Sequence, residues 1–448
     1  MFLLLFLTHG VNTIRDAGDT DGTSLPAYLQ GMADGRFIGP RSFAAGPFIN
    51  KGSTRWTNTL HVDSPVDAER IARELVRRGA RCMKLYENLT VDEIAALERA
   101  AAEHGLVSLG HVPTKLGIEE ARLKDAQHFF GVAPPASLPR DHVLDRLSWY
   151  EAVDAKRMVV VVRSAVENGL ANTPTLVVTE RLLTAGPEGR TDDPSLGLLP
   201  RFFREVIWHP QYGLPAYRRP DPARVRRLAA AHEKKLELVR RLYQAGALLR
   251  IGTDWQSFVV QGDALHRETK LFEQAGIPTA VVLRIATRDA ALALGQEDLG
   301  TVRRGAVADL LLRSSDPTKD LSALRSMWAV CHQGALLRSV PLGRATRSPA
   351  RPRPHLRAPG RRNPRPPLDV DHGPPFHRLT VSGAPARHLL GPMRSRWRFR
   401  PFDPPAPRLR LTGASPEPLP CQTPSKGLGQ VITVARVARA PSERCRAR

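Results

Sequence analysis

Short apolar runs alternate with helical periodicity from residue 11 to residue 294, and this alternation constrains the fold more than any other feature. The pattern predicts strands over residues 11–15, 42–49, 81–86, 107–111, 126–131, 170–178 and 247–253. Helices are predicted over residues 67–78, 90–104, 118–123, 223–245, 265–275 and 278–294. A further long helical region is predicted to end at residue 168. Such alternation indicates an α/β fold with a parallel sheet, and at this length a closed (β/α)8 TIM-like barrel is the leading architecture.

Local signals support these element boundaries. Thr90 is followed three residues later by Glu93, the capping-box pattern of a helix start, and Gly105 is placed to end the same helix. A doubly wound sheet would instead carry a glycine-rich phosphate loop after an early strand. Neither GxGxxG nor GxxxxGK[ST] occurs, so nucleotide binding of those types is not expected.

The positive charge of the chain is concentrated at its C-terminal end. Of the net charge of +22, residues 344–448 carry +17, together with 20 of the 39 prolines. Frequent proline prevents regular structure, so this segment is predicted to be disordered. Two interpretations stay open: a basic arm that binds nucleic acid or anionic surfaces, or an out-of-frame reading of a GC-rich gene. We favour the second, so nucleic acid is an unlikely partner.

Cysteine usage and hydropathy exclude several classes of protein. The four cysteines lie far apart and form no CxxC pair, so neither a disulfide framework nor a cysteine-built zinc module is expected. No apolar run reaches the roughly 18 residues of a membrane-spanning helix. Residues 1–7, MFLLLFL, lack a basic n-region and a cleavage site, so we interpret them as the last turn of a buried helix.

Four polar residues lie within or at the ends of separate predicted strands. They are Lys84, His111, His128 and Asp254. Each alone has a structural explanation, as a hydrogen-bonded histidine, a surface lysine or a turn residue. Together, at the carboxyl ends of barrel strands, they indicate a catalytic site. Two imidazoles and a carboxylate suit a divalent ion such as zinc, and a buried lysine there must lose its proton or be chemically masked.

The order and spacing of several segments resemble the amidohydrolase superfamily, in particular its imidazolonepropionase-like and prolidase-like branch. The resemblance covers about residues 8–340. The matching segments are GVNTIRD at 10–16, MKLY at 83–86, GHVP at 110–113, QHF at 127–129, TPTL at 173–176, GTD at 252–254, HRE at 266–268 and LGTVRRGAVADL at 299–310.

The resemblance implies a binuclear metal hydrolase that cleaves an amide, cyclic amide or peptide-like C–N bond by a metal-bound hydroxide. Lys84 would be carboxylated and would bridge two divalent ions, with zinc the expected metal. His111 and His128 would bind the second ion. Asp254 would bind the first ion and act as the general base that passes a proton to the leaving amine.

By the same resemblance, Tyr86, His266 and Glu268 are expected on the substrate side of the site, in a supporting role. The substrate would be a small or dipeptide-like molecule, and residues 180–224, with Trp208, Tyr212 and Tyr217, would cover its pocket. The expected domains are a barrel over 1–298, the C-terminal half of a β-sandwich over 299–343, and the tail. Homo-oligomerisation and compartment are left open, with the cytoplasm as the default.

One family feature has no counterpart in this sequence. Family members start with sandwich strands and a first barrel strand that ends in HxH, and no HxH occurs here. The chain would then hold half of the first metal site, so one ion or none is expected and activity is in question. Three hypotheses follow: an amidohydrolase with an incomplete or mis-started reading frame, a non-catalytic remnant acting as a binding module, and nucleic-acid association through the tail.

Overall fold

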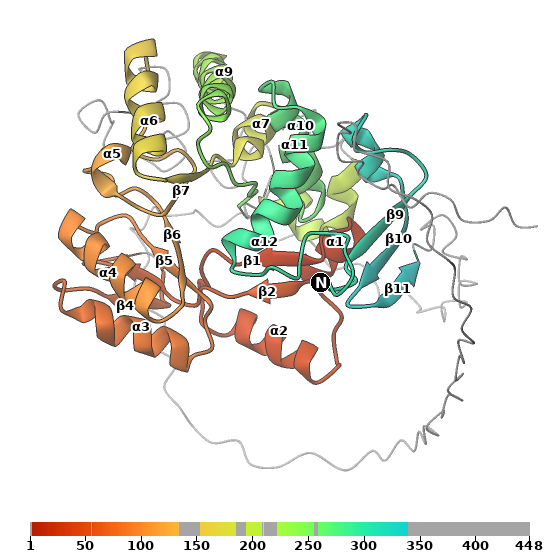
Figure 1. Cartoon of the computed structure of the whole chain (residues 1–448), viewed down its shortest axis with the longest axis horizontal. Helices are drawn as coiled ribbons and strands as arrows, with labels where there is room; N and C mark the ends of the chain where they lie inside the picture. The colour runs from red at the N-terminus through yellow and green to blue at the C-terminus, as the bar shows by residue number, and fades with distance from the viewer. Residues whose placement is uncertain are drawn as a thin grey trace, which may run out of the picture. The chain divides into compact units, whose positions relative to one another are not determined.

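The computed structural model describes residues 2–54, 56–133, 153–184, 194–207, 209, 222–254 and 259–338 (Figure 1). The predicted tail over 344–448 lies outside the described residues, as do Trp208, Tyr212 and Tyr217. Within the described ranges, no helix combines the length and the apolar character needed to cross a membrane.

A six-stranded parallel sheet in the order β4-β3-β5-β6-β7-β8 forms the centre of the fold. Its strands are β3 (Phe48–Asn50), β4 (Thr59–His61), β5 (Cys82–Leu85), β6 (Val107–Gly110), β7 (Asp125–Gln127) and β8 (Ala171–Thr173). A separate parallel pair, β1 (Thr13–Arg15) and β2 (Arg41–Phe43), lies beside the start of β5, because Ala44 O accepts backbone hydrogen bonds from Arg81 and Cys82. At the β8 edge of the six-stranded sheet, Leu249 bridges to Asn172. The described residues thus form a partial TIM-like barrel.

Helices follow the strands in the predicted alternation and cover the sheet (Figure 1). The bounds are α1 (Phe2–Thr8), α2 (Ser24–Ala33), α3 (Asp67–Arg77), α4 (Val91–Glu103), α5 (Ile118–Ala121), α6 (Ala155–Glu167), α7 (Leu176–Thr184), α9 (Pro222–Gln244), α10 (Asp263–Gln274), α11 (Thr279–Arg284) and α12 (Ala290–Ala293). Helices α3, α4, α5, α6 and α9 each contact the next, as the outer helices of a barrel do. The predicted capping box is present, with Thr90 and Glu93 satisfying each other's backbone amides at the start of α4.

The structure corrects four predicted strands. The strand expected over 42–49 is two strands, β2 and β3, because Gly46 turns the chain between them with φ +69°. The strand expected over 126–131 ends at Gln127, because the next two residues adopt positive φ. The strand expected over 170–178 ends at Thr173 and is followed by α7, and the 247–253 segment makes a single bridge. Helix α2 and strand β4 were not predicted.

Three antiparallel strands follow the barrel helices. They are β9 (Leu310–Arg313), β10 (Met327–His332) and β11 (Ala335–Arg338), in the order β11-β10-β9. They lie in the range expected for half of a β-sandwich. Two salt bridges and one hydrogen bond illustrate how distant segments join: Arg41 of β2 pairs with Asp309, Arg325 pairs with Asp263 of α10, and Asn12 donates to Cys331 O.

Candidate active site

The loops that follow β6 and β7 bring two of the predicted imidazoles together. The rings of His111 and His128 meet edge to face, with centroids 4.7 Å apart. His128 Nε2 lies 3.9 Å from Asp254 Oδ2, on the segment that bridges to β8. The carboxyl ends of β6 and β7 therefore place the two imidazoles together, and the segment that follows the Leu249 bridge brings Asp254 beside His128.

Lys84 projects from β5 into the same region. Its side chain is buried, and its ammonium group donates a hydrogen bond to Gln127 Oε1, directly before His128. The Nζ atom lies 5.9 Å from the centroid of the Tyr86 ring. Burial lowers the pKa of Lys84 to about 7, while the attraction of Asp254 acts to raise it. A lysine with such a pKa is partly an uncharged amine near neutral pH.

The hydrogen bonds of Thr175 determine the tautomer of His128. Thr175 Oγ1 donates its single proton to Pro174 O at 2.8 Å and lies 2.7 Å from His128 Nδ1. The hydroxyl must then accept from this nitrogen, so Nδ1 carries the proton and the Nε2 lone pair faces Asp254. Burial lowers the pKa of His128 to about 4, which keeps the ring neutral at pH 7. A neutral imidazole with an anchored N–H is the form that binds metal ions.

Aromatic and acidic neighbours hold His111 and Tyr86. His111 Nδ1 contacts Glu87 Oε1 at 3.1 Å, and its ring packs on those of Tyr86 and Phe130. The Tyr86 hydroxyl accepts a hydrogen bond from Trp56 Nε1 at 2.9 Å. Sequence reasoning missed Glu87, although it directly follows the strand predicted over 81–86, and Trp56, which lies between β3 and β4 in a segment with no predicted element.

The donor set fits one divalent ion in its chemistry. Two neighbouring imidazoles and a carboxylate are ligand types that zinc prefers, and His128 is held in the required tautomer. Among the described residues, no three His, Cys, Asp or Glu side chains are close enough to form a ready-made metal site. Metal binding would therefore draw His111, His128 and Asp254 closer together than they are here.

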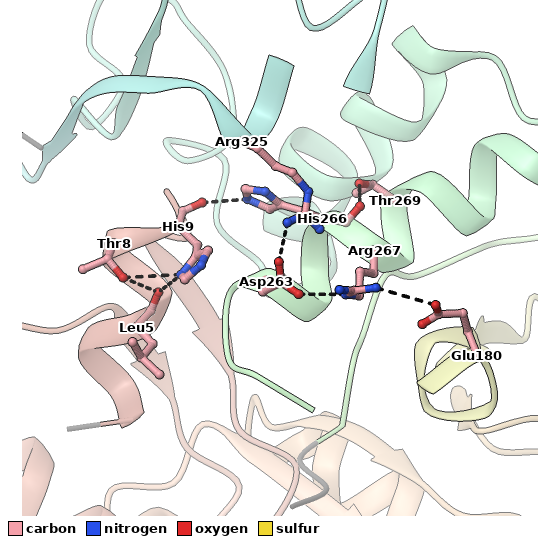
Figure 2. A network of polar contacts seen from close by, with 9 residues as sticks. All are labelled: Leu5, Thr8, His9, Glu180, Asp263, His266, Arg267, Thr269 and Arg325. Carbon is pink, nitrogen blue, oxygen red and sulfur yellow. Dashed lines mark hydrogen bonds and ion pairs between the residues drawn. The ribbon is translucent and has the colours of Figure 1, made fainter. Parts of the chain in front are cut away.

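The structure does not bring His266 to this cluster. His266 Nε2 lies 2.8 Å from His9 O, at the end of α1, and burial lowers the pKa of its ring to about 4. Figure 2 shows this contact beside a network in which Asp263 pairs with both Arg267 and Arg325. The polar contacts of His266 are thus made with another part of the backbone, and its contact with substrate stays a prediction.

Glu268 is also engaged elsewhere in the fold. Its two carboxylate oxygens accept hydrogen bonds from the backbone amides of Leu176 and Val177, at 2.9 and 2.6 Å. The side chain is fully buried. Its predicted contact with substrate is likewise untested, and its visible role is to cap helix α7.

Comparisons with known proteins agree with this fold. No model of a protein family matches the chain, and no curated protein matches it. The solved structure of bottromycin amidohydrolase is similar with 26% identity and a TM-score of 0.60, covering 75% of this chain and 73% of that one. A Xaa-Pro dipeptidase with bound methionine is similar with 20% identity and a TM-score of 0.53, covering 75% and 77%. Ochratoxinase from A. niger is similar with 18% identity and a TM-score of 0.51, covering 75% and 73%.

Each of these similarities covers three quarters of the chain. The bottromycin amidohydrolase structure is 26% identical to this chain and supports a general amidohydrolase function. The other two support the fold. The resemblance inferred from the sequence motifs is therefore confirmed, and this chain has the fold of the amidohydrolase superfamily.

Proposed function

We propose that this chain is a metal-dependent amidohydrolase that cleaves the C–N bond of an amide, a cyclic amide or a peptide-like small molecule. The single observation that carries the proposal is the meeting of His111, His128 and Asp254 beside the buried Lys84. The similarity to an amidohydrolase and a dipeptidase supports hydrolysis of a C–N bond in particular.

In this proposal, His111, His128 and a carboxylated Lys84 would hold one divalent ion, with zinc expected. A bound ion would supply Lewis acidity and a hydroxide at neutral pH. Because the sequence has no HxH, we propose a single ion for this chain.

Asp254 is proposed as the general base. Its carboxylate is partly exposed and lies beside His128, so it can receive a proton from the attacking water and deliver it to the leaving amine. Lys84 and Gln127 would order the polar side of the site, and Tyr86, held by Trp56, would line the substrate side. His266 and Glu268 have no step in this scheme.

Metal analysis and turnover of the full chain test the proposal together. After reconstitution with zinc, the chain should hold about one ion and hydrolyse members of a panel of Xaa-Pro dipeptides and N-acyl amino acids. His128→Asn should lose the ion, and Asp254→Asn should lose turnover. His104→Asn is the matched control, because His104 pairs with Glu69 at the end of α4. This variant should leave the bound ion and the turnover unchanged. A folded chain that binds no zinc and hydrolyses nothing would favour a non-catalytic binding module.

A further inference from the structure

Glu268 of α10 bonds to α7 and is attracted by Lys235 of α9, so it connects three helices. It projects from α10, and both of its oxygens accept backbone amides of the first turn of α7. A fully buried carboxylate needs hydrogen-bond donors or a paired cation, and the amides at a helix N-terminus otherwise lack partners. Burial raises the pKa of Glu268 to about 8, while the two amides and Lys235 act to lower it. The two amide donors, one on each oxygen, favour the charged carboxylate against the effect of burial.

The residue before this helix turn is strained. Thr175 has φ +50°, a left-handed conformation that is uncommon for a β-branched residue. Such a conformation persists only where the surroundings hold it. The Glu268 bonds to Leu176 and Val177, the next two residues, supply that restraint.

A second buried contact holds the same helix one turn further on. Lys235 of α9 is fully buried and donates a hydrogen bond to Thr179 Oγ1 at 2.9 Å. Burial lowers the pKa of Lys235 to about 7, while the attraction of Glu268 acts to raise it. Helix α7 is therefore tied to both α10 and α9, and it directly follows Thr175, which contacts His128.

We propose that Glu268 is a positioning residue for His128, acting through the first turn of α7. By holding that turn, it keeps the Thr175 hydroxyl against His128 Nδ1, which leaves the Nε2 lone pair facing Asp254. The effect of Glu268 on metal binding rests on the proposed function. Its effect on the tautomer of His128 does not depend on that function. Residues that orient a metal-binding histidine in this way typically contribute about 10- to 100-fold to metal affinity.

The test uses the full chain labelled with ¹⁵N-histidine, with His128 assigned by comparison with a His128→Gln variant. In the metal-free wild type, His128 should be found as the Nδ1–H tautomer. Glu268→Gln, which can accept only one of the two amides well, should raise the Nε2–H fraction and weaken zinc binding about tenfold. Thr175→Val should do the same, and Thr175→Ser, which keeps the hydroxyl, should retain the Nδ1–H form.

Glu93→Gln is the matched control. Glu93 is also a buried glutamate that accepts a backbone amide at a helix N-terminus, from Thr90 at 2.9 Å, but it belongs to α4. This variant should leave the His128 tautomer and the zinc affinity within about twofold of wild type. Should Glu268→Gln fail to fold, Glu268→Asp, shorter by one methylene, is expected to shift the tautomer in the same direction.

The double variant decides whether Glu268 acts through Thr175. In the Thr175→Val background, Glu268→Gln should add little further loss of zinc affinity. Full additivity, or a tautomer in Glu268→Gln that equals wild type, would overturn the proposal. If wild type binds no zinc while the tautomer still responds to Glu268, the positioning role stands and the proposed metal function fails.

Discussion

Asp125 and Arg15 form an ion pair inside the barrel, and replacing Asp125 by asparagine should destabilise the fold by about 3 kcal/mol. Asp125 Oδ2 lies 2.6 Å from Arg15 Nη1, and Asp125 Oδ1 accepts the Thr173 hydroxyl at 2.8 Å. Burial lowers the pKa of Arg15, but the attraction of Asp125 more than offsets this and raises it above the usual guanidinium value. The pair joins β1 to β7, which are not neighbours in the sheet.

The magnitude follows from burial. Two charges at about 4 Å interact by about 4 kcal/mol at an effective dielectric constant near 20, and stranding one member of a buried pair costs about 3–5 kcal/mol. The side chain of Arg15 is 16% exposed and that of Asp125 is 6% exposed, so some solvent screening remains and the lower end applies. Asparagine has nearly the same shape as aspartate, so no cavity term is added.

Urea unfolding of the full chain at pH 7, followed by circular dichroism, measures the effect. The double variant Arg15→Met with Asp125→Leu should lose much less than the single variant, because both charges leave together. Asp34→Asn, which breaks the exposed pair with Arg36, should cost under about 1 kcal/mol. A loss below about 1 kcal/mol for Asp125→Asn, or a double variant as unstable as the sum of the single ones, would refute the reasoning.

Three further predictions concern buried titratable groups. Lys84→Ala should remove most turnover and lower the number of metal ions bound per chain, measured by elemental mass spectrometry. Retention of both the turnover and the metal would refute the proposed role of Lys84. Burial lowers the pKa of His266 to about 4 from 6.5, so the unfolded chain binds more protons between these values and stability falls as pH drops from 6.5 to 4. His266→Gln should reduce that fall by up to about 3 kcal/mol in urea titrations, and an unchanged pH dependence would contradict the assignment. Burial raises the pKa of Cys82 to about 12, which leaves roughly 0.1% thiolate at pH 9, so iodoacetamide should label Cys82 in urea but not in the folded chain. Rapid labelling of the folded chain, seen by peptide mass mapping, would show that the thiol is not buried.

Local patterns in the sequence were enough to predict many helices and the strand ends that carry the site. The capping box of Thr90 and Glu93 forms within four residues, so it depends on nothing distant. The strands that place Lys84 and His111 match the prediction to within one residue at each end, because each is a mainly apolar run followed by polar residues. The strand before His128 is shorter than predicted and ends at Gln127. Their shared position follows from the parallel sheet alone, since all carboxyl ends of its strands meet at one edge.

The tertiary structure decided where each of these strands stops and how the side chains are held. The predicted strand over 170–178 gives way to α7 because Glu268, 92 residues away along the chain, caps that helix at Leu176. The tautomer of His128 depends on Thr175, 47 residues away. Hydrogen bonds between such distant residues leave no periodic trace in the sequence. The sequence by itself therefore determined the fold class and the candidate residues, while long-range packing determined their orientation and protonation.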